Sequence, residues 1–239
     1  MSNSSLATYK LISPNKTVSR NHVIDTITIH CVVGQLSAEK VCAMFAKPSR
    51  KASSNYVIGK DGEIGLCVDE KDRSWCSSNS ANDHRAITIE CASDTNPPYK
   101  INDAVYKSLI NLLVDVCKRN KIPELRWRNN RNLIGKVDLQ NITVHRWFAN
   151  KSCPGDYIFN RLGKIAQEVN DRLKITNFKV RVLNHDPIPI KMGPDWKSGT
   201  VKTVLDQGVY TIVEVNGNWG KLKSGLGWIP LPYTERVVD

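Results

Sequence analysis

A short run of β-branched residues, Ile142–Val144, ends in a histidine, His145, and a lysine and a cysteine follow at Lys151 and Cys153 before a Pro-Gly pair. An imidazole at the end of a strand and a thiolate that folds back across a short loop are both ligands that zinc accepts. Two protein ligands do not hold a catalytic zinc, which usually has three. The spacing therefore predicts part of a metal site and requires a third ligand elsewhere.

Two further segments have the sequence pattern of half-buried strands that end in a polar residue. Apolar and polar residues alternate in Asp25–Val33, which carries His30 towards its end, and in Ala86–Cys91, which carries Glu90. If these strands lie beside the one that leads to His145, two imidazoles and one carboxylate gather at one edge of a sheet. The sequence thus predicts three metal ligands and a general base.

Each of these residues alone has a simpler explanation. A single histidine at a strand end is more often a hydrogen-bonded structural residue, and a single intracellular cysteine is usually a small buried hydrophobe. In combination they indicate a zinc site made of His30, His145 and Cys153, with Glu90 as the base. The other six cysteines are predicted to be packing residues with free thiols: Cys31, Cys42, Cys67, Cys76, Cys91 and Cys117.

In these motifs the chain resembles the type-2 class of zinc-dependent N-acetylmuramoyl-L-alanine amidases, which share their fold with peptidoglycan-recognition proteins and include many phage endolysins. The resemblance runs from about residue 25 to residue 174. The matching segments are a first ligand strand at Ile27–His30, a hairpin with an Asp-Gly turn at Asn55–Ile64, an acidic strand at Asn82–Glu90 and a ligand-lysine-ligand loop at His145–Cys153.

The resemblance implies a peptidoglycan hydrolase that cleaves the amide between N-acetylmuramic acid and L-alanine with zinc-activated water. Glu90 is then expected to take the proton of the attacking water and pass it to the leaving amine, and Lys151 to stabilise the oxyanion. Many relatives carry a tyrosine where this chain has Ser54, so we assign no tyrosine role and expect proton transfer to depend on Glu90. Two alternatives remain: a recognition protein without catalysis, and a zinc endopeptidase of the wall peptide.

Length and composition favour two domains and a wall substrate. The 239 residues suit a medium domain at 1–174 and a small one at 175–239. No apolar run is long enough for a membrane span, and the N-terminus lacks the pattern of a Sec signal. We therefore expect the protein to be made in the cytoplasm of a bacterial host and to reach the cell wall through a holin-type lesion. The wall is expected to be that of a Gram-positive cell. Oligomeric state and the phage or bacterial origin stay open.

The net charge of +11 is concentrated in the first domain. Residues 1–174 carry 26 Lys and Arg against 17 Asp and Glu, a net charge of +9. The densest patch, Arg126–Arg131, interleaves cations with a tryptophan, which can indicate nucleic acid. Without a nucleic-acid-binding motif we favour a solvated face or attraction to an anionic wall polymer. In the loop 71–82, Trp75 either lines a glycan groove or plugs the loop.

The elements that must position the site are an α/β arrangement. A short helix is expected after Ser37, which can cap it, and before Pro48. Apolar residues at helical spacing predict a long helix over 105–116 and another over 162–173. Residues 2–23 have no strong period and are expected to be irregular. Strands interleaved with helices imply a mixed central sheet flanked by helices.

Beyond Lys174 the pattern changes to short β runs separated by turns. Strands are expected at 178–182, 208–215, 218–222 and 227–229. This half resembles the bacterial SH3-type cell-wall-binding domains, which implies a small all-β barrel. We expect Trp219 and Trp228 in its core, and Trp196 and Tyr233 on its surface.

Overall fold

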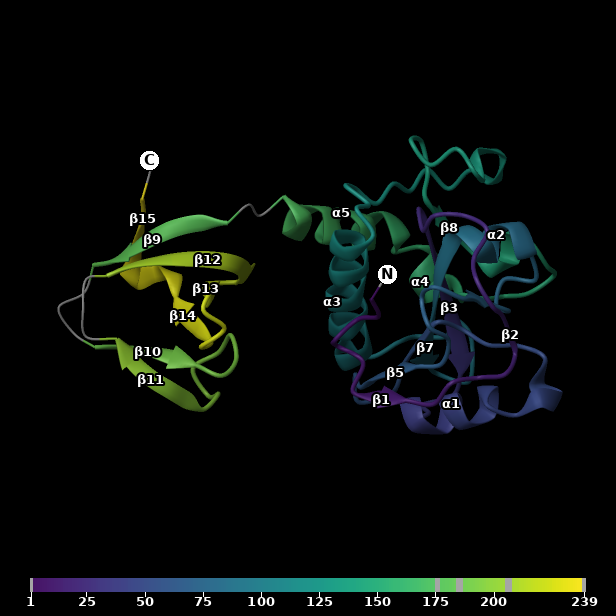
Figure 1. Ribbon diagram of the computed structural model, residues 1–239, viewed down its shortest axis with the longest axis horizontal. Coiled ribbons are helices and arrows are strands. Elements are labelled where there is room, and N and C mark those ends of the chain that lie inside the picture. Colours follow the sequence, from purple (N-terminus) through teal and green to yellow (C-terminus); the bar gives the residue numbers. More distant parts are fainter. Residues whose placement is uncertain (1, 175–176, 184–186, 205–207, 238–239) are drawn as a thin grey trace. The chain divides into compact units, whose positions relative to one another are not determined.

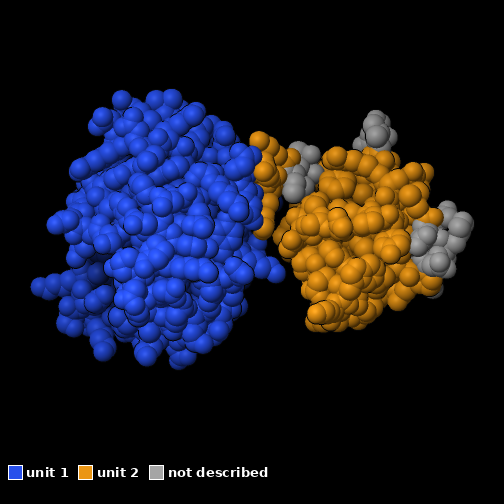
Figure 2. Space-filling model, turned by 180° about the vertical axis from the view of Figure 1, so that it is seen from behind, with its two compact units in different colours: residues 1–170 blue, residues 171–239 orange. Residues whose placement is uncertain are grey.

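The computed structural model divides the chain into two compact units, residues 1–170 and residues 171–239 (Figure 2). The structure describes all residues except 1, 175–176, 184–186, 205–207 and 238–239. The first residue of the predicted second domain, Ile175, lies outside the described residues. Helix α5 (Leu162–Leu173) runs across the division between the two units.

The first unit is built on a six-stranded mixed sheet (Figure 1). In spatial order its strands are β1 (Tyr9–Lys10), β5 (Ile64–Leu66), β4 (Tyr56–Ile58), β7 (Ala86–Ser93), β3 (Thr26–Val33) and β8 (Ile142–Thr143). Only β4 and β5 pair antiparallel, as the predicted Asp-Gly hairpin requires; the other neighbours are parallel. The three strands that lead to His30, Glu90 and His145 are adjacent, as predicted.

The central strands of this sheet are apolar on one face, which must be covered, whereas the opposite face carries Thr28, Thr88, His30 and Glu90. Buried isoleucines alternate along β3 and β7 and are fully inaccessible to solvent. The helices are α1 (Ala38–Phe45), α2 (Ser80–Arg85), α3 (Asp103–Arg119), α4 (Asp156–Phe159) and α5, with short 3-10 turns η1 (Pro48–Arg50), η2 (Arg131–Leu133) and η3 (His145–Trp147). Helix α1 packs on β4 and β5, and α3 packs on β4 and β7. The predicted α/β fold of this unit is confirmed.

The helix boundaries follow capping chemistry. The Ser37 side chain accepts a hydrogen bond from the backbone N–H of Lys40, which starts α1 where predicted. Asn102 caps α3 in the same way, by accepting from the N–H of Val105. None of the helices among the described residues is long and apolar enough to cross a membrane.

The N-terminal segment is more ordered than the sequence predicts. It contains β1, which extends the main sheet, and β2 (Lys16–Thr17), which pairs antiparallel with β6 (Arg73–Ser74). Strands of two residues are too short to leave a period in the sequence, so the pattern could not reveal them.

Beyond the end of α5, the described residues of the second unit form seven strands in antiparallel pairs. In spatial order they are β11 (Thr200–Val204), β10 (Ile188–Lys191), β14 (Trp228–Pro230), β13 (Trp219–Leu222), β12 (Val209–Asn216), β9 (Phe178–Val182) and β15 (Thr234–Val237), and η4 (Leu231–Tyr233) precedes the last. The four predicted strands are present, and β10, β11 and β15 are additional. Trp219 and Trp228 are buried, whereas Trp196 and Tyr233 are exposed, as expected.

Candidate functional site

Adjacent strands place His30 and Glu90 side by side. Strands β3 and β7 are parallel, and His30 is the register partner of Glu90. The prediction that these residues end their strands is wrong: the ladder continues to Val33 and Ser93. The pairing goes on through Cys31 with Cys91, Val32 with Ala92 and Val33 with Ser93, so both strands extend three residues beyond the site.

His145 and Cys153 close over this pair from the segment that follows β8. The strand ends at Thr143, and His145 begins the 3-10 turn η3 instead of ending the strand. The backbone N–H of Arg146 donates to the carbonyl of Cys153 at 3.1 Å, which folds the loop back on itself. The two imidazole rings meet edge to face with centroids 5.2 Å apart.

His30, His145 and Cys153 offer donor atoms that all lie within 4.8 Å of one another. The Cys153 Sγ lies 3.3 Å from the His30 Nδ1. Two imidazoles and one thiol at this separation match the ligand types that zinc takes in enzymes. The structure therefore brings together the three residues predicted as ligands.

The protonation states of the histidines suit a cation. Burial, and then the charge of His145, lower the pKa of His30 to about 3, so its ring is neutral at pH 7. Burial also lowers the pKa of His145. A hydrogen bond with Cys31 and burial raise the pKa of the Cys153 thiol, so this ligand needs a bound dication to lose its proton. The His30 Nε2 is buried without a hydrogen-bond partner among the described residues. This donor set fits zinc.

Glu90 has the properties of a general base or acid near neutral pH. Burial raises its pKa from 4.5 to about 7, and the positive charge of Arg50 works in the opposite direction. Its Oε2 is buried without a partner in the described part of the chain, and its Oε1 lies 3.9 Å from the Cys76 Sγ. Such a carboxyl group can accept a proton and return it at physiological pH.

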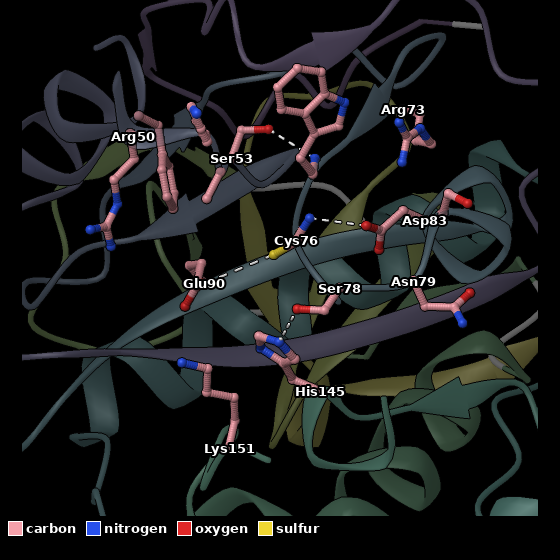
Figure 3. A pocket seen from close by; sticks show the side chains of 15 residues that line it. Arg50, Ser53, Arg73, Cys76, Ser78, Asn79, Asp83, Glu90, His145 and Lys151 are labelled. Carbon is pink, nitrogen blue, oxygen red and sulfur yellow. Dashed lines mark hydrogen bonds between the residues drawn. The ribbon is translucent and has the colours of Figure 1, made fainter. Parts of the chain in front are cut away.

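A pocket of about 630 Å³ opens beside these residues (Figure 3). Figure 3 shows the Glu90 carboxyl and the Lys151 amine on the same side of the His145 ring. Charged side chains line much of the pocket: Arg50, Lys51, Arg73 and Lys151 are cationic, and Asp83 and Glu90 are acidic. The cations outnumber the acids, so the pocket suits a polar, anionic substrate.

Comparison with known proteins decides the family. The model of the N-acetylmuramoyl-L-alanine amidase family matches residues 20–156. The chain belongs to this family. It is thus an N-acetylmuramoyl-L-alanine amidase, a hydrolase of peptidoglycan. A search of curated proteins gave no match.

Several solved structures are similar to this amidase. A mutant endolysin from Bacillus subtilis matches with a TM-score of 0.51 and 14% identity, over 67% of this chain and 97% of that chain. The AmpD structure matches with a TM-score of 0.49 and 18% identity, over 69% and 96%. The amidase LysC from Clostridium intestinale matches with a TM-score of 0.46 and 19% identity, over 70% and 94%.

The loop at residues 75–79 of the amidase forms one wall of the pocket, and the sequence indicates a part in the site only for its Trp75, as one of two alternatives. The buried Asp83 carboxylate accepts from the backbone N–H groups of Cys76 and Ser77 at 3.0 to 3.2 Å. The Ser78 Oγ lies 2.9 Å from the His145 Nε2, and Ser78 has a positive φ of 63°. Asp83 thus fixes a strained loop whose serine contacts His145, one of the candidate ligands.

Other residues that the sequence singled out lie around this site. Trp75 lines the pocket, and its Nε1 donates to the Thr17 Oγ1 at 3.0 Å, so it both plugs the loop and forms a wall. The Ser54 hydroxyl is buried and donates to the carbonyl of Tyr56. None of the residues Arg126–Arg131 lines the pocket among the described residues.

Proposed function

We propose that this amidase is zinc-dependent and that His30, His145 and Cys153 hold the metal. The observation that carries the proposal is the convergence of one thiol and two neutral imidazoles beside a carboxyl group whose pKa is raised towards 7. A zinc ion at such a position supplies Lewis acidity, which polarises a carbonyl and makes water a stronger nucleophile at neutral pH.

Glu90 and Lys151 carry out the remaining chemistry. The Glu90 carboxylate removes the proton of the attacking water, and the protonated Glu90 then gives it to the amine of L-alanine as the amide bond breaks. A carboxyl group with a pKa near 7 can serve in both directions at neutral pH. The Lys151 side chain lines the same pocket as Glu90 and His145, where its ammonium stabilises the oxyanion that forms on the carbonyl.

The second unit serves as a wall anchor of the SH3 type. The sequence segments that resemble such domains lie on β12, β13 and β14, in an antiparallel all-β unit with its own apolar core. The exposed Trp196 ring lies 5.0 Å from Trp219 and 6.2 Å from Tyr233, centroid to centroid. This aromatic group is the surface that we assign to wall contact.

The biological setting that we propose is lysis of a Gram-positive host. The protein is made in the host cytoplasm and reaches the wall after a holin-type lesion opens the membrane. The net charge of +9 on residues 1–174 attracts the enzyme to an anionic wall.

The test digests purified Gram-positive walls with the full chain and analyses the products by mass spectrometry. An amidase frees the amino group of L-alanine and leaves intact glycan without peptide, whereas an endopeptidase leaves the lactyl amide uncut. A recognition protein releases nothing. Metal analysis of the same preparation should find about one zinc, and the variant Cys153→Ser should lose it. Cleavage that persists in a zinc-free preparation contradicts the proposed mechanism.

A further inference from the structure

Cys76 is placed beside the catalytic carboxylate, although the sequence assigns it only a packing role. Its Sγ lies 3.9 Å from the Glu90 Oε1, and its backbone N–H is fixed by Asp83 at 3.0 Å. Figure 3 shows the sulfur inside the pocket, between the Asp83 side of the loop and Glu90. A thiol at this position needs an explanation beyond packing.

The donor atoms of His30, Cys76 and Glu90 form a second compact group, again within 4.8 Å of one another. Two of these residues carry a buried polar atom with no hydrogen-bond partner among the described residues, namely the His30 Nε2 and the Glu90 Oε2. Native structures leave few such atoms unpaired, and a bound ion is one explanation for those that remain. Imidazole, thiolate and carboxylate are all zinc ligands.

His30 is common to both donor groups and has two ring nitrogens. Its Nδ1 lies 3.3 Å from the Cys153 Sγ, while its Nε2 is unpartnered. One residue can therefore contribute to both groups, and the two groups share one edge of the sheet.

We propose that His30, Cys76 and Glu90 form a second, inhibitory zinc site. The inference rests on the proposed function, because the inhibition comes from occupying the carboxylate that serves as the general base. A Glu90 oxygen that binds a metal ion can no longer take a proton from water. On binding, up to three protons pass to solvent, and no electron is transferred. They are the thiol proton of Cys76, the carboxyl proton of Glu90 where it is present, and the remaining N–H proton of His30, whose ring then bridges the two ions.

Electrostatics favour a zinc ion at this position only with both anionic ligands in place. The thiolate and the carboxylate together match the charge of the dication, and the imidazolate charge of His30 is shared between the two ions, so the buried site gains no net positive charge. The pocket also contains Arg50 and Lys151, which disfavour an uncompensated cation. Because the thiol proton must be displaced, the second ion binds more weakly at low pH, and it requires zinc in excess of one equivalent.

The experiment uses the full-length holoenzyme loaded with one equivalent of zinc and dialysed against rising zinc concentrations. It compares the wild-type protein with Cys76→Ala and with the matched control Cys117→Ala, which removes a buried thiol from α3 away from the pocket. Bound zinc is counted, and the activity on soluble muropeptide is expressed relative to that of the same variant at one equivalent.

The wild-type protein and Cys117→Ala should take up a second zinc and lose about 10²- to 10⁴-fold of their activity, the usual effect of losing a general base. Cys76→Ala should stay at one zinc and keep its own activity. Cobalt provides a readout that needs no variant: a second equivalent added to the wild-type protein should increase the thiolate-to-metal charge-transfer band.

Two results overturn the inference. One is a wild-type protein that stays at one zinc in excess metal, with no growth of the thiolate band; the other is a Cys76→Ala variant that still binds the second ion. Failure of the proposed function looks different, because the first equivalent of zinc would then be absent or would remain in Cys153→Ser.

Discussion

Replacing Glu90 by glutamine should stabilise the metal-free protein while removing its catalysis. Burial raises the pKa of Glu90 from 4.5 to about 7. Since one pKa unit corresponds to about 1.4 kcal/mol, ionised Glu90 lowers the free energy of unfolding by at most about 3 kcal/mol. The pocket leaves part of the residue accessible, and the glutamine amide needs hydrogen bonds of its own, so we expect a gain of about 1 to 3 kcal/mol.

The direction of the pH dependence follows from the two pKa values. Below about pH 4, Glu90 is protonated in both the folded and the unfolded chain and has no differential effect. Between about 4.5 and 7 the unfolded chain ionises while the folded protein keeps its proton, so stability falls as the pH rises. Above about 7 the loss is complete and constant. The advantage of Glu90→Gln should therefore be absent at about pH 4 and full at about pH 8.

Urea denaturation in the presence of a chelator, at several pH values, measures this difference. Glu124→Gln is the matched control, because Glu124 is 47% exposed and such surface changes usually alter stability by less than about 1 kcal/mol. With zinc restored, Glu90→Gln should bind the metal and lose about 10²- to 10⁴-fold in kcat. A variant that gains no stability between low and high pH would refute the assignment of Glu90 as a buried carboxyl group with a raised pKa.

Three further predictions concern the metal and the two units. His30→Ala should abolish zinc binding, and full zinc content in this variant would remove His30 from the ligand set. Ser78→Ala should weaken zinc binding by about 10- to 100-fold in a chelator competition, because it removes the partner of the His145 Nε2; an affinity unchanged from that of the control Ser80→Ala would show that Ser78 does not orient the histidine. A chain ending at residue 174 should hydrolyse soluble muropeptide at nearly the full rate but bind intact walls about 10²- to 10⁴-fold less tightly, with the remainder lost in high salt. Equal sedimentation of both chains with walls would argue against an anchoring role for the second unit.

The residues proposed as ligands and base could be brought together from the sequence because strands record their geometry in it. Alternating residues around His30 and Glu90 identify two strands, and parallel strands bring equivalent positions to one edge of a sheet. The apolar residues over 105–116 and 162–173 likewise locate α3 and α5. Periodicity does not show where a strand stops, so the pattern alone predicts strand ends at His30 and Glu90, whereas the pairing continues to Val33 and Ser93.

The wall of the pocket could not be predicted, because a loop leaves no period in the sequence. Cys76 is held by a hydrogen bond from its backbone N–H to Asp83 in the next helix. Ser78 is held by its contact with His145, which is distant in the chain. The cap of α2 did leave a signal in the sequence, because the Asn79 side chain accepts a hydrogen bond from the backbone N–H of Asn82 at the start of that helix. Recognising that cap would have placed Asp83 inside the first turns of a helix, facing back towards the loop.

A buried polar layer joins this loop to the strands that carry the ligands. The Thr28 and Thr143 hydroxyls lie 2.8 Å apart, and each is two residues before a histidine that we propose as a ligand. The Asn82 side chain donates to Thr28 at 3.0 Å and to the Ser77 hydroxyl at 3.1 Å, and it accepts from Thr143 at 2.9 Å. Because side chains alternate along β3, Thr28 shares a face of the strand with His30, so this layer lies directly beside that proposed ligand. A change in any member therefore moves the loop and the histidines together, and the site is held as one unit with the sheet edge that presents it.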